Sequence, residues 1–424
     1  MSDAVGTDAQ YGWRMVLRRS AALLAGETSA RVIGFFVVLL LARRLGPSGF
    51  GVVTLGLALV GWFSRVVDSG TEMLNIREVA RSPSRFRTIA EQMLGLRLAL
   101  SIPAMAAFIV GVEVFAKSPH TRDTVVLFAV LLPAVALNLR WMALGVGGSR
   151  RIAAGNIAGR LLVLVGVLLL VTEDSDIERV PFLEAAGELV YGLIVLGIAG
   201  GAVGFIRPRA DLKVWRSTLR QSSPLMLGAL ARTTVSTFDI LLIGLALGPR
   251  AVGIYGVAIK PAWFAAGAVS LFALSFLSAL SATATEHAAT LHRKALRSSF
   301  VACVAVAAVV SASSLLLPFV FGEDYTDAVP VLAVVAWRIP TTALAFMYST
   351  VLVADGRQKT LMWNSIFAAV PIIVIDLVAI LAFGLMGAAV ASVVAGLILF
   401  AVNYRSVTRY QPALRVLSPR DASA

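Results

Sequence analysis

Long apolar runs recur along almost the whole chain, and they limit the fold more than any other feature of the sequence. Stretches such as LLVLVGVLLLV contain no charged residue and do not alternate between polar and apolar positions. About 20 apolar residues cross a bilayer core as a helix, whereas the strands of a membrane β-barrel alternate. The chain is 58% apolar and only 14% charged, and soluble domains carry about 25% charged residues. We therefore expect an all-α, polytopic membrane protein.

The same composition excludes several other classes of protein. Disordered chains and coiled coils are much richer in charged residues, and cytosolic enzymes are less apolar. Cys303 is the only cysteine, which also excludes a secreted scaffold held by disulfides. The first apolar run ends in LLLARRLGP, without the small residues of a signal-peptide cleavage site. We expect this run to be retained as a membrane span.

Twelve apolar segments are long enough to cross a membrane. They cover residues 20–42, 50–69, 89–116, 123–146, 152–172, 181–206, 222–246, 252–277, 298–320, 328–353, 361–383 and 386–404. The connections between them are short, and none is long enough for a folded domain outside the membrane.

Lysine and arginine residues predict the orientation. Most of the 37 basic residues fall in alternate connections and near the two ends, at residues 14–19, 77–87, 150–151, 207–220, 293–297, 357–359 and 405–420. Cytoplasmic connections carry this excess in membrane proteins, so both termini are predicted to be cytoplasmic, in the inner (cytoplasmic) membrane. The net charge of +13 is then a topology signal that also attracts anionic membrane lipids, and nucleic acid is not expected as a partner.

Two similar segments indicate an internal repeat. LGPSGFGVVTLG starts at Leu45 and LGPRAVGIYGVA at Leu247, and an Ala-Arg pair precedes each of them, at Arg31 and at Arg232. Six predicted spans separate the copies, so the halves are expected to be parallel repeats. The predicted organisation is an N-terminal six-helix lobe at 1–206, a basic cytoplasmic linker at 207–221, and a C-terminal six-helix lobe with a basic tail at 222–424.

Three segments carry a family resemblance. They are ARVIGFFVVLLLARRLGPSGFGVVTLG with the REVAR that follows it, ARTTVSTFDILLIGLALGPRAVGIYGVAIKP, and LPFVFGEDYTDAVPVL. All three resemble Wzx-type polysaccharide and O-antigen flippases of the multidrug/oligosaccharidyl-lipid/polysaccharide (MOP) exporter superfamily, and the resemblance extends from Arg18 to Tyr404. It implies two lobes around a central cavity that work by alternating access. It also implies transfer of an undecaprenyl-pyrophosphate-linked oligosaccharide from the inner to the outer leaflet, for O-antigen or exopolysaccharide synthesis.

The resemblance also implies roles for two residues. Arg31 matches a functionally important arginine in the first span of the relative that flips the peptidoglycan precursor. Asp239 stands before LLIG as in the family pattern.

Charged residues within the predicted spans form the candidate site. Arg31, Arg232 and Arg338 lie near mid-span, where each arginine costs about 2.5–3.5 kcal/mol to insert. We expect them to line a cationic cavity for a pyrophosphate or acidic sugar, because a guanidinium matches phosphate oxygens. Arg31 and Arg232, related by the repeat, are expected to face each other across it. Lys260 and Arg140 complete the predicted substrate-binding set.

Two other interpretations of these charges stay open. In one, ion pairs hold the helices in register, since Glu27 lies one turn before Arg31 and Asp239 two turns after Arg232. In the other, basic side chains near the ends of the spans reach lipid phosphates. The residues to which the second interpretation applies are Arg65, Arg97, Arg140, Arg160 and, on the outer side, Lys260.

Buried carboxylates are the candidates for energy coupling. Asp239, Asp376 and Glu27 are expected to exchange protons or sodium, because burial favours the protonated carboxyl group. A membrane potential acting on an anionic substrate is the alternative. The three histidines form no metal-ligand set, and the sequence has neither a P-loop nor a nucleophile triad. We therefore expect no metal, no other cofactor and no enzymatic activity.

A flippase for lipid-linked oligosaccharides is the favoured function, with a polysaccharide polymerase and glycosyltransferases as expected partners. A cation-coupled drug or small-molecule exporter of the same superfamily is an alternative, although such exporters favour acidic cavities and the mid-span charge here is basic. A membrane polymerase or ligase would need a larger outer loop. A non-transporting scaffold for cell-wall synthesis is the fourth hypothesis.

Overall fold

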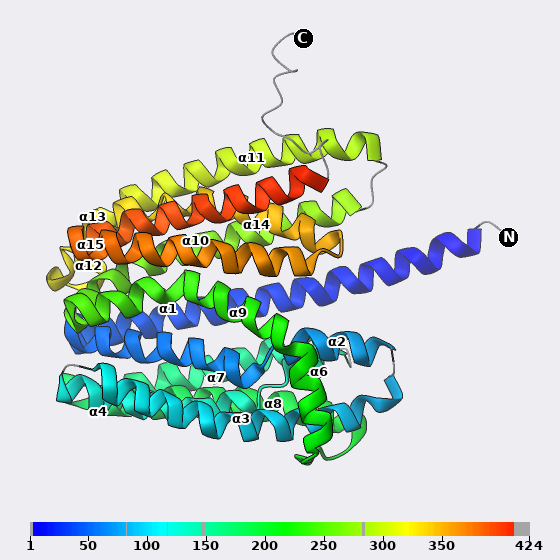
Figure 1. Ribbon diagram of the computed structural model, residues 1–424, viewed down its shortest axis with the longest axis horizontal. Coiled ribbons are helices and arrows are strands. Elements are labelled where there is room, and N and C mark those ends of the chain that lie inside the picture. The colour runs from blue at the N-terminus through cyan, green and yellow to red at the C-terminus, as the bar shows by residue number, and fades with distance from the viewer. Residues whose placement is uncertain (1–2, 82, 117, 146–148, 282–284, 411–424) are drawn as a thin grey trace, which may run out of the picture. The chain divides into compact units, whose positions relative to one another are not determined.

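The computed structural model describes residues 3–81, 83–116, 118–145, 149–281 and 285–410, and within these ranges the regular structure is entirely helical (Figure 1). This confirms the predicted all-α fold class. The chain forms two compact units, Met1–Met226 (unit 1) and Leu227–Ala424 (unit 2). The boundary between them falls inside a helix, α9.

The helices have the following bounds. Unit 1 contains α1 Asp3–Asp68, α2 Thr71–Arg81, α3 Phe86–Phe115, α4 Pro119–Leu127, α5 Leu131–Ala136, α6 Arg140–Gly145, α7 Ser149–Leu170, α8 Val180–Val203 and the start of α9 Leu212–Leu247. Unit 2 contains the rest of α9, then α10 Pro249–Ser281, α11 Thr285–Ala312, α12 Leu317–Phe321, α13 Ala328–Val335, α14 Arg338–Ala354 and α15 Gln358–Tyr410. The 3₁₀ helices are η1 Pro83–Arg85, η2 Phe128–Val130, η3 Asp174–Arg179, η4 Ser313–Leu316 and η5 Glu323–Tyr325.

Nine helical segments in the described part of the chain are long and apolar enough to cross a membrane. Two of them, within α1 and α15, each cover two of the predicted spans. Both α1 and α15 fold back on themselves at a glycine with non-helical backbone angles (Figure 1). The predicted span 252–277 lies within α10. The helices therefore follow the predicted order of spans, although their bounds differ by several residues.

The reversals show why glycine occupies these positions. Gly46 in α1 has φ 61° and ψ −178°, and Gly384 in α15 has φ 58°. Gly248, which joins α9 to α10, has φ 87°. Side chains rarely tolerate positive φ, and proline directly after Gly46 and Gly248 cannot continue a preceding helix. The two Leu-Gly-Pro motifs of the repeat thus make the same kind of turn.

Two predicted spans are not continuous helices. The span predicted at 123–146 is interrupted at Leu137–Leu139, between α5 and α6. The span predicted at 328–353 is interrupted at 336–337, between α13 and α14. The reason for the second break is local, because Pro340 has no N–H group and cannot continue the helical hydrogen bonds. The carbonyl oxygen of Ala336 instead accepts a hydrogen bond from the N–H of Ile339, at 3.0 Å. These two spans are the fourth of each predicted half.

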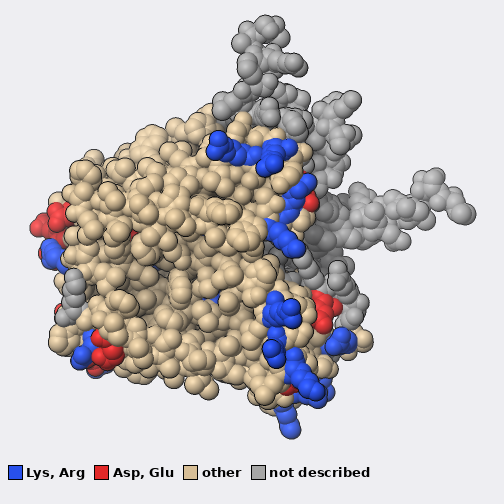
Figure 2. Space-filling view, in the orientation of Figure 1, with Lys and Arg blue, Asp and Glu red and all other residues tan. Residues whose placement is uncertain are grey.

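Large apolar side chains are exposed along the helices, as expected where lipid is the solvent. Examples in the two units are Ile102, Leu169, Phe319 and Phe383. On the face shown in Figure 2, uncharged side chains cover the middle of the helices of each unit, and charged side chains gather near the helix ends. This distribution supports a multi-pass membrane protein.

The turn at Gly46 gives a test of the first helical reversal. A Cβ at Gly46 would meet nothing within 4 Å, so Gly46→Ala acts through backbone strain alone. We expect it to lower the free energy of unfolding by about 1–3 kcal/mol, seen as a lower thermal midpoint of tryptophan fluorescence in detergent. Gly61→Ala is the matched control, because Gly61 is helical, also has open space around it and gains helix propensity. Equal midpoints for the two variants would contradict this account of the turn.

Candidate functional site

Each broken span places an arginine at the start of the helix that follows the break. Arg140 is the first residue of α6 and Arg338 is the first residue of α14. Discontinuous helices commonly form the binding sites of membrane transporters, because unwound backbone is tolerated only where protein or a hydrated cavity receives it. Both arginines were predicted from the sequence to bind substrate.

In unit 1, the arginine at the break contacts a carboxylate from the first helix. The Nη2 atom of Arg140 donates a hydrogen bond to Oε1 of Glu27, at 2.5 Å. Glu72 and Tyr191 also interact electrostatically with the Arg140 guanidinium. Helices α1, α2, α6 and α8 therefore contribute polar groups to one cluster around Arg140.

In unit 2, the corresponding cluster is more deeply buried. Asp239 on α9 is only 4% exposed, and its Oδ2 accepts a hydrogen bond from the Tyr255 hydroxyl of α10 at 2.6 Å. Asp376 on α15 is 3% exposed. The positive charge of Arg338 interacts with both carboxylates. The structure thus brings together three residues that the sequence analysis singled out separately, and adds Tyr255.

Another arginine, which is fully enclosed by protein, holds the broken span of unit 1. Arg97 on α3 is 4% exposed. Its Nη1 donates to the backbone carbonyl of Asn138 at 2.6 Å, inside the break, and its Nη2 donates to Oδ1 of Asp68. The guanidinium therefore supplies the donor that the unwound carbonyl lacks. The prediction that Arg97 reaches lipid phosphates is wrong, because the side chain is enclosed by protein.

The other basic residues near the span ends, which were also predicted to reach lipid phosphates, have different surroundings. Arg160 on α7 donates to Oε2 of Glu184 on α8 at 3.0 Å, and Arg140 pairs with Glu27, so carboxylates rather than lipid receive these two side chains. Arg65 is exposed at the end of α1. The ammonium group of Lys260 lies 5.7 Å from the ring centroid of Trp263, a cation–π contact.

The same-helix ion pairs expected from spacing are replaced by contacts between helices. Within the described residues no ion pair joins Glu27 to Arg31, and Glu27 pairs with Arg140 instead. The hydrogen-bond partner of Asp239 is Tyr255 on the neighbouring helix. Arg31 and Arg232 are both exposed, on α1 and α9 respectively. Both residues therefore lie at the surface of their own units.

In the described ranges, no three histidine, cysteine or acidic side chains lie close enough together to hold a metal ion.

The sequence analysis did not identify Tyr255 or the acidic partners Asp68 and Glu184. A carboxylate within an apolar helix was the available signal for Glu184, since such a residue needs a partner to be tolerated there.

The ion pair between the buried Arg97 and Asp68 gives a test of its contribution to stability. Arg97→Met leaves the Asp68 carboxylate and the Asn138 carbonyl without this donor, so we expect a loss of about 3–5 kcal/mol in stability. The double variant Arg97→Met/Asp68→Asn should lose less than the sum of the two single variants. Thermal midpoints in detergent measure these effects, and the exposed Arg65→Met is the control. Equal midpoints for Arg97→Met and Arg65→Met would contradict a buried structural role.

The sequence matches a family of known proteins over most of its length. A family model described as "Polysaccharide biosynthesis protein" matches residues 16–280, more than half of the chain. A protein of Escherichia coli (strain K12) named "Putative O-antigen transporter" is 22% identical over 252 residues. That match covers 58% of this chain and 60% of the relative, so the chain aligns with less than two thirds of the relative's length.

Solved structures of the MOP superfamily share the fold. The lipid II flippase MurJ in an inward closed conformation has a TM-score of 0.72 at 15% identity, covering 91% of this chain and 87% of that one. An inward-facing multidrug resistance transporter of the MATE family has a TM-score of 0.70, also at 15% identity, covering 93% and 96%. A MOP superfamily transporter from Pyrococcus furiosus has a TM-score of 0.58 at 15% identity, covering 94% and 96%.

At such low identity these structures establish the fold alone, which is that of the MOP transporters. The match to the family model establishes more than the fold, because it covers more than half of the sequence, residues 16–280. The chain therefore belongs to the polysaccharide biosynthesis protein family, with the fold of a MOP exporter.

Proposed function

We propose that the protein moves a lipid-linked oligosaccharide from the inner to the outer leaflet of the cytoplasmic membrane, by alternating access of its two lobes. The lipid carrier is an undecaprenyl pyrophosphate, and both termini of the protein face the cytoplasm. Membership of a polysaccharide biosynthesis family, together with relatives named as an O-antigen transporter and a lipid II flippase, supports this function.

One observation carries the proposal beyond family membership. The first apolar helix of each predicted half presents an exposed arginine, Arg31 on α1 and Arg232 on α9. An arginine at the bilayer centre costs about 2.5–3.5 kcal/mol to insert and is normally turned to a hydrated cavity or to a partner group. A pyrophosphate is such a partner, because the planar guanidinium matches two phosphate oxygens and is charged at any physiological pH.

Arg31 and Arg232 are therefore each proposed to bind the pyrophosphate. Arg338, Arg140 and Lys260 are less exposed than these two arginines. Carboxylates interact with Arg338 and Arg140, and the Trp263 ring contacts Lys260. We assign to those three a supporting role, in which the substrate competes with the carboxylates for the guanidinium groups.

Replacing the exposed arginines tests the proposed function. In cells that lack the native gene and carry Arg31→Ala or Arg232→Ala, we expect surface polysaccharide to fall at least tenfold, because a charge-assisted hydrogen bond contributes about 1.5–3 kcal/mol. Lipid-linked sugar should accumulate in the inner leaflet while the amount of transporter stays unchanged. Arg65→Ala, another exposed arginine of α1, is the control. Normal export by both single variants would overturn the proposal.

Energy coupling is assigned to the buried cluster of unit 2. When both carboxylates are ionised, Asp239, Asp376 and Arg338 together carry one net negative charge, which is costly away from water. A proton or a sodium ion at the carboxylates removes this charge. The groups that face one another here are the two aspartates, Arg338 and the Tyr255 hydroxyl. Binding and release of the cation would then accompany the change of access.

Carboxamide variants test the coupling. We expect Asp239→Asn and Asp376→Asn to abolish the response of transport in proteoliposomes to an imposed pH or sodium gradient, because the amide cannot take up either cation as a carboxylate does. Binding of undecaprenyl pyrophosphate should be retained. Asp324→Asn, at an exposed position of unit 2, is the control. A response like that of the wild type in both variants would leave the membrane potential as the energy source.

A further inference from the structure

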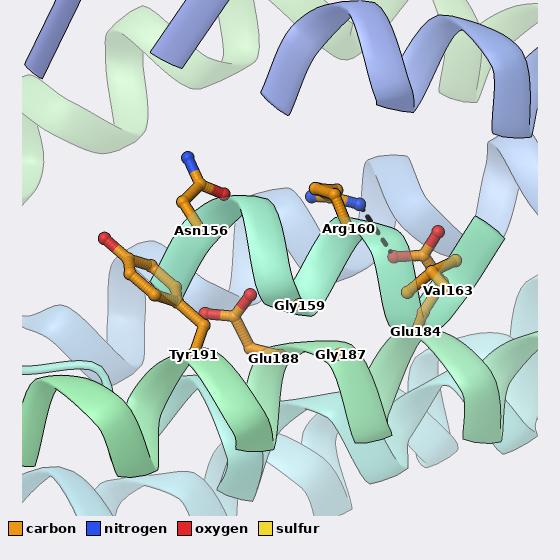
Figure 3. A pocket seen from close by; sticks show the side chains of 8 residues that line it. All are labelled: Asn156, Gly159, Arg160, Val163, Glu184, Gly187, Glu188 and Tyr191. Atoms are coloured by element: carbon orange, nitrogen blue, oxygen red, sulfur yellow. Dashed lines mark hydrogen bonds and ion pairs between the residues drawn. The ribbon is translucent and has the colours of Figure 1, made fainter. Parts of the chain in front are cut away.

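A polar recess lies between α7 and α8 and shares Tyr191 with the cluster around Arg140. It is partly open to the surroundings and is lined by Asn156, Gly159, Arg160, Val163, Glu184, Gly187, Glu188 and Tyr191. Figure 3 shows that the polar side chains from both helices point to the same side of the helix pair. The recess lies entirely within unit 1.

Two glycines bring the helices together beneath these side chains. A Cβ at Gly159 would lie 2.5 Å from the backbone oxygen of Gly187, and one at Gly187 would lie 2.8 Å from the oxygen of Gly159. No side chain other than hydrogen fits at either position without moving a helix. The close approach holds the polar groups on the two helices within reach of a single small ligand.

Part of the recess is already internally paired. Arg160 donates to Oε2 of Glu184 at 3.0 Å, and Asn138 donates to Oε1 of Glu188 at 2.9 Å. The charge of Glu184 is therefore balanced by a guanidinium, and one oxygen of Glu188 is occupied by an amide donor. The remaining guanidinium N–H groups of Arg160 and the second oxygen of Glu188 stay available.

Two further groups make no hydrogen bond within the part of the chain that the structure describes. Tyr191 is only 8% exposed, yet its hydroxyl has no protein partner there, and neither does the amide of Asn156. In Figure 3 the Tyr191 hydroxyl and the Asn156 amide project into the same space. Asn156 is only partly buried, and neither polar group is sealed inside the protein, so a ligand that enters the recess can form hydrogen bonds with both.

We propose that this recess binds the hydroxyl groups of one sugar of the transported oligosaccharide. The proposal rests on the proposed function and names the part of the substrate that unit 1 recognises. A sugar hydroxyl both donates and accepts, and the recess offers both kinds of group: the amide of Asn156, the hydroxyl of Tyr191, an oxygen of Glu188 and the N–H groups of Arg160. Sites built for hydroxyl groups discriminate strongly, because an absent hydroxyl leaves buried groups unpaired.

A cation is the competing ligand, and the pairing pattern argues against it. A bare cation needs several oxygen ligands directed at one point. Here Glu184 is neutralised by Arg160, and the guanidinium group repels a positive ion. The recess is also partly open to the surroundings, so a sugar can present one hydroxyl edge to the polar groups while the rest of its ring stays outside.

Binding of two lipids by the full-length protein in nanodiscs tests the proposal. The first probe is the lipid-linked oligosaccharide extracted from cells lacking this gene, and the second is undecaprenyl pyrophosphate without sugar. We expect Tyr191→Phe and Asn156→Ala each to weaken binding of the first probe roughly three- to tenfold, the effect of one neutral hydrogen bond. Binding of the second probe should not change. Tyr348→Phe, which removes the hydroxyl of a buried tyrosine in unit 2, should affect neither probe.

The outcomes separate this proposal from the proposed function. Arg31→Ala should weaken binding of both probes, because it acts on the pyrophosphate. If the wild type binds neither lipid, the proposed function fails. If the wild type binds both, and the recess variants leave the preference for the glycosylated lipid unchanged, the sugar subsite is wrong and the function stands. A change in the sodium or pH dependence of binding, equal for both probes, would identify a cation site and overturn the proposal.

Discussion

Neutralising guanidinium groups inside an apolar helix bundle is the constraint on which the rest of this structure depends. Arg97 meets it with the Asp68 carboxylate and the Asn138 carbonyl, and Arg140 meets it with Glu27. Each contact joins helices that are distant in sequence. Since an unpaired buried charge is far more costly than a paired one, these contacts fix which helices lie side by side within unit 1, and the apolar surfaces pack around them.

The two units solve this problem in a related way. Each contains a broken span with an arginine at the start of the next helix, a carboxylate contributed by the unit's first apolar helix, and a tyrosine hydroxyl close by: Tyr191 beside Arg140, and Tyr255 beside Asp239. The unit 2 cluster adds a second carboxylate, Asp376, and is more deeply buried. This difference supports the proposed exchange of a cation at the unit 2 cluster.

The fold was largely predictable from the sequence, and the site was only partly so. Apolar runs and the Leu-Gly-Pro repeat predicted the helices and the turns at Gly46 and Gly248, because both signals are local. The partners of the charged residues were not predictable. Spacing along one helix suggested Glu27 with Arg31, whereas the partner is Arg140, more than 100 residues away. The break at residues 137–139 was also hidden, because a single polar residue, Asn138, between two leucines does not predict an interruption, and the stabilising donor, Arg97, lies on another helix.

The contact between Arg97 and the Asn138 carbonyl has a consequence for biogenesis. Neither α5 nor α6 is long enough to cross a bilayer alone, and the unwound peptide between them would be poorly tolerated in lipid. The arginine that satisfies it lies on α3, which leaves the ribosome first. Synthesis from the N-terminus therefore places Arg97 in the membrane before Asn138. We expect the broken span of α5 and α6 to integrate into the membrane only together with α3.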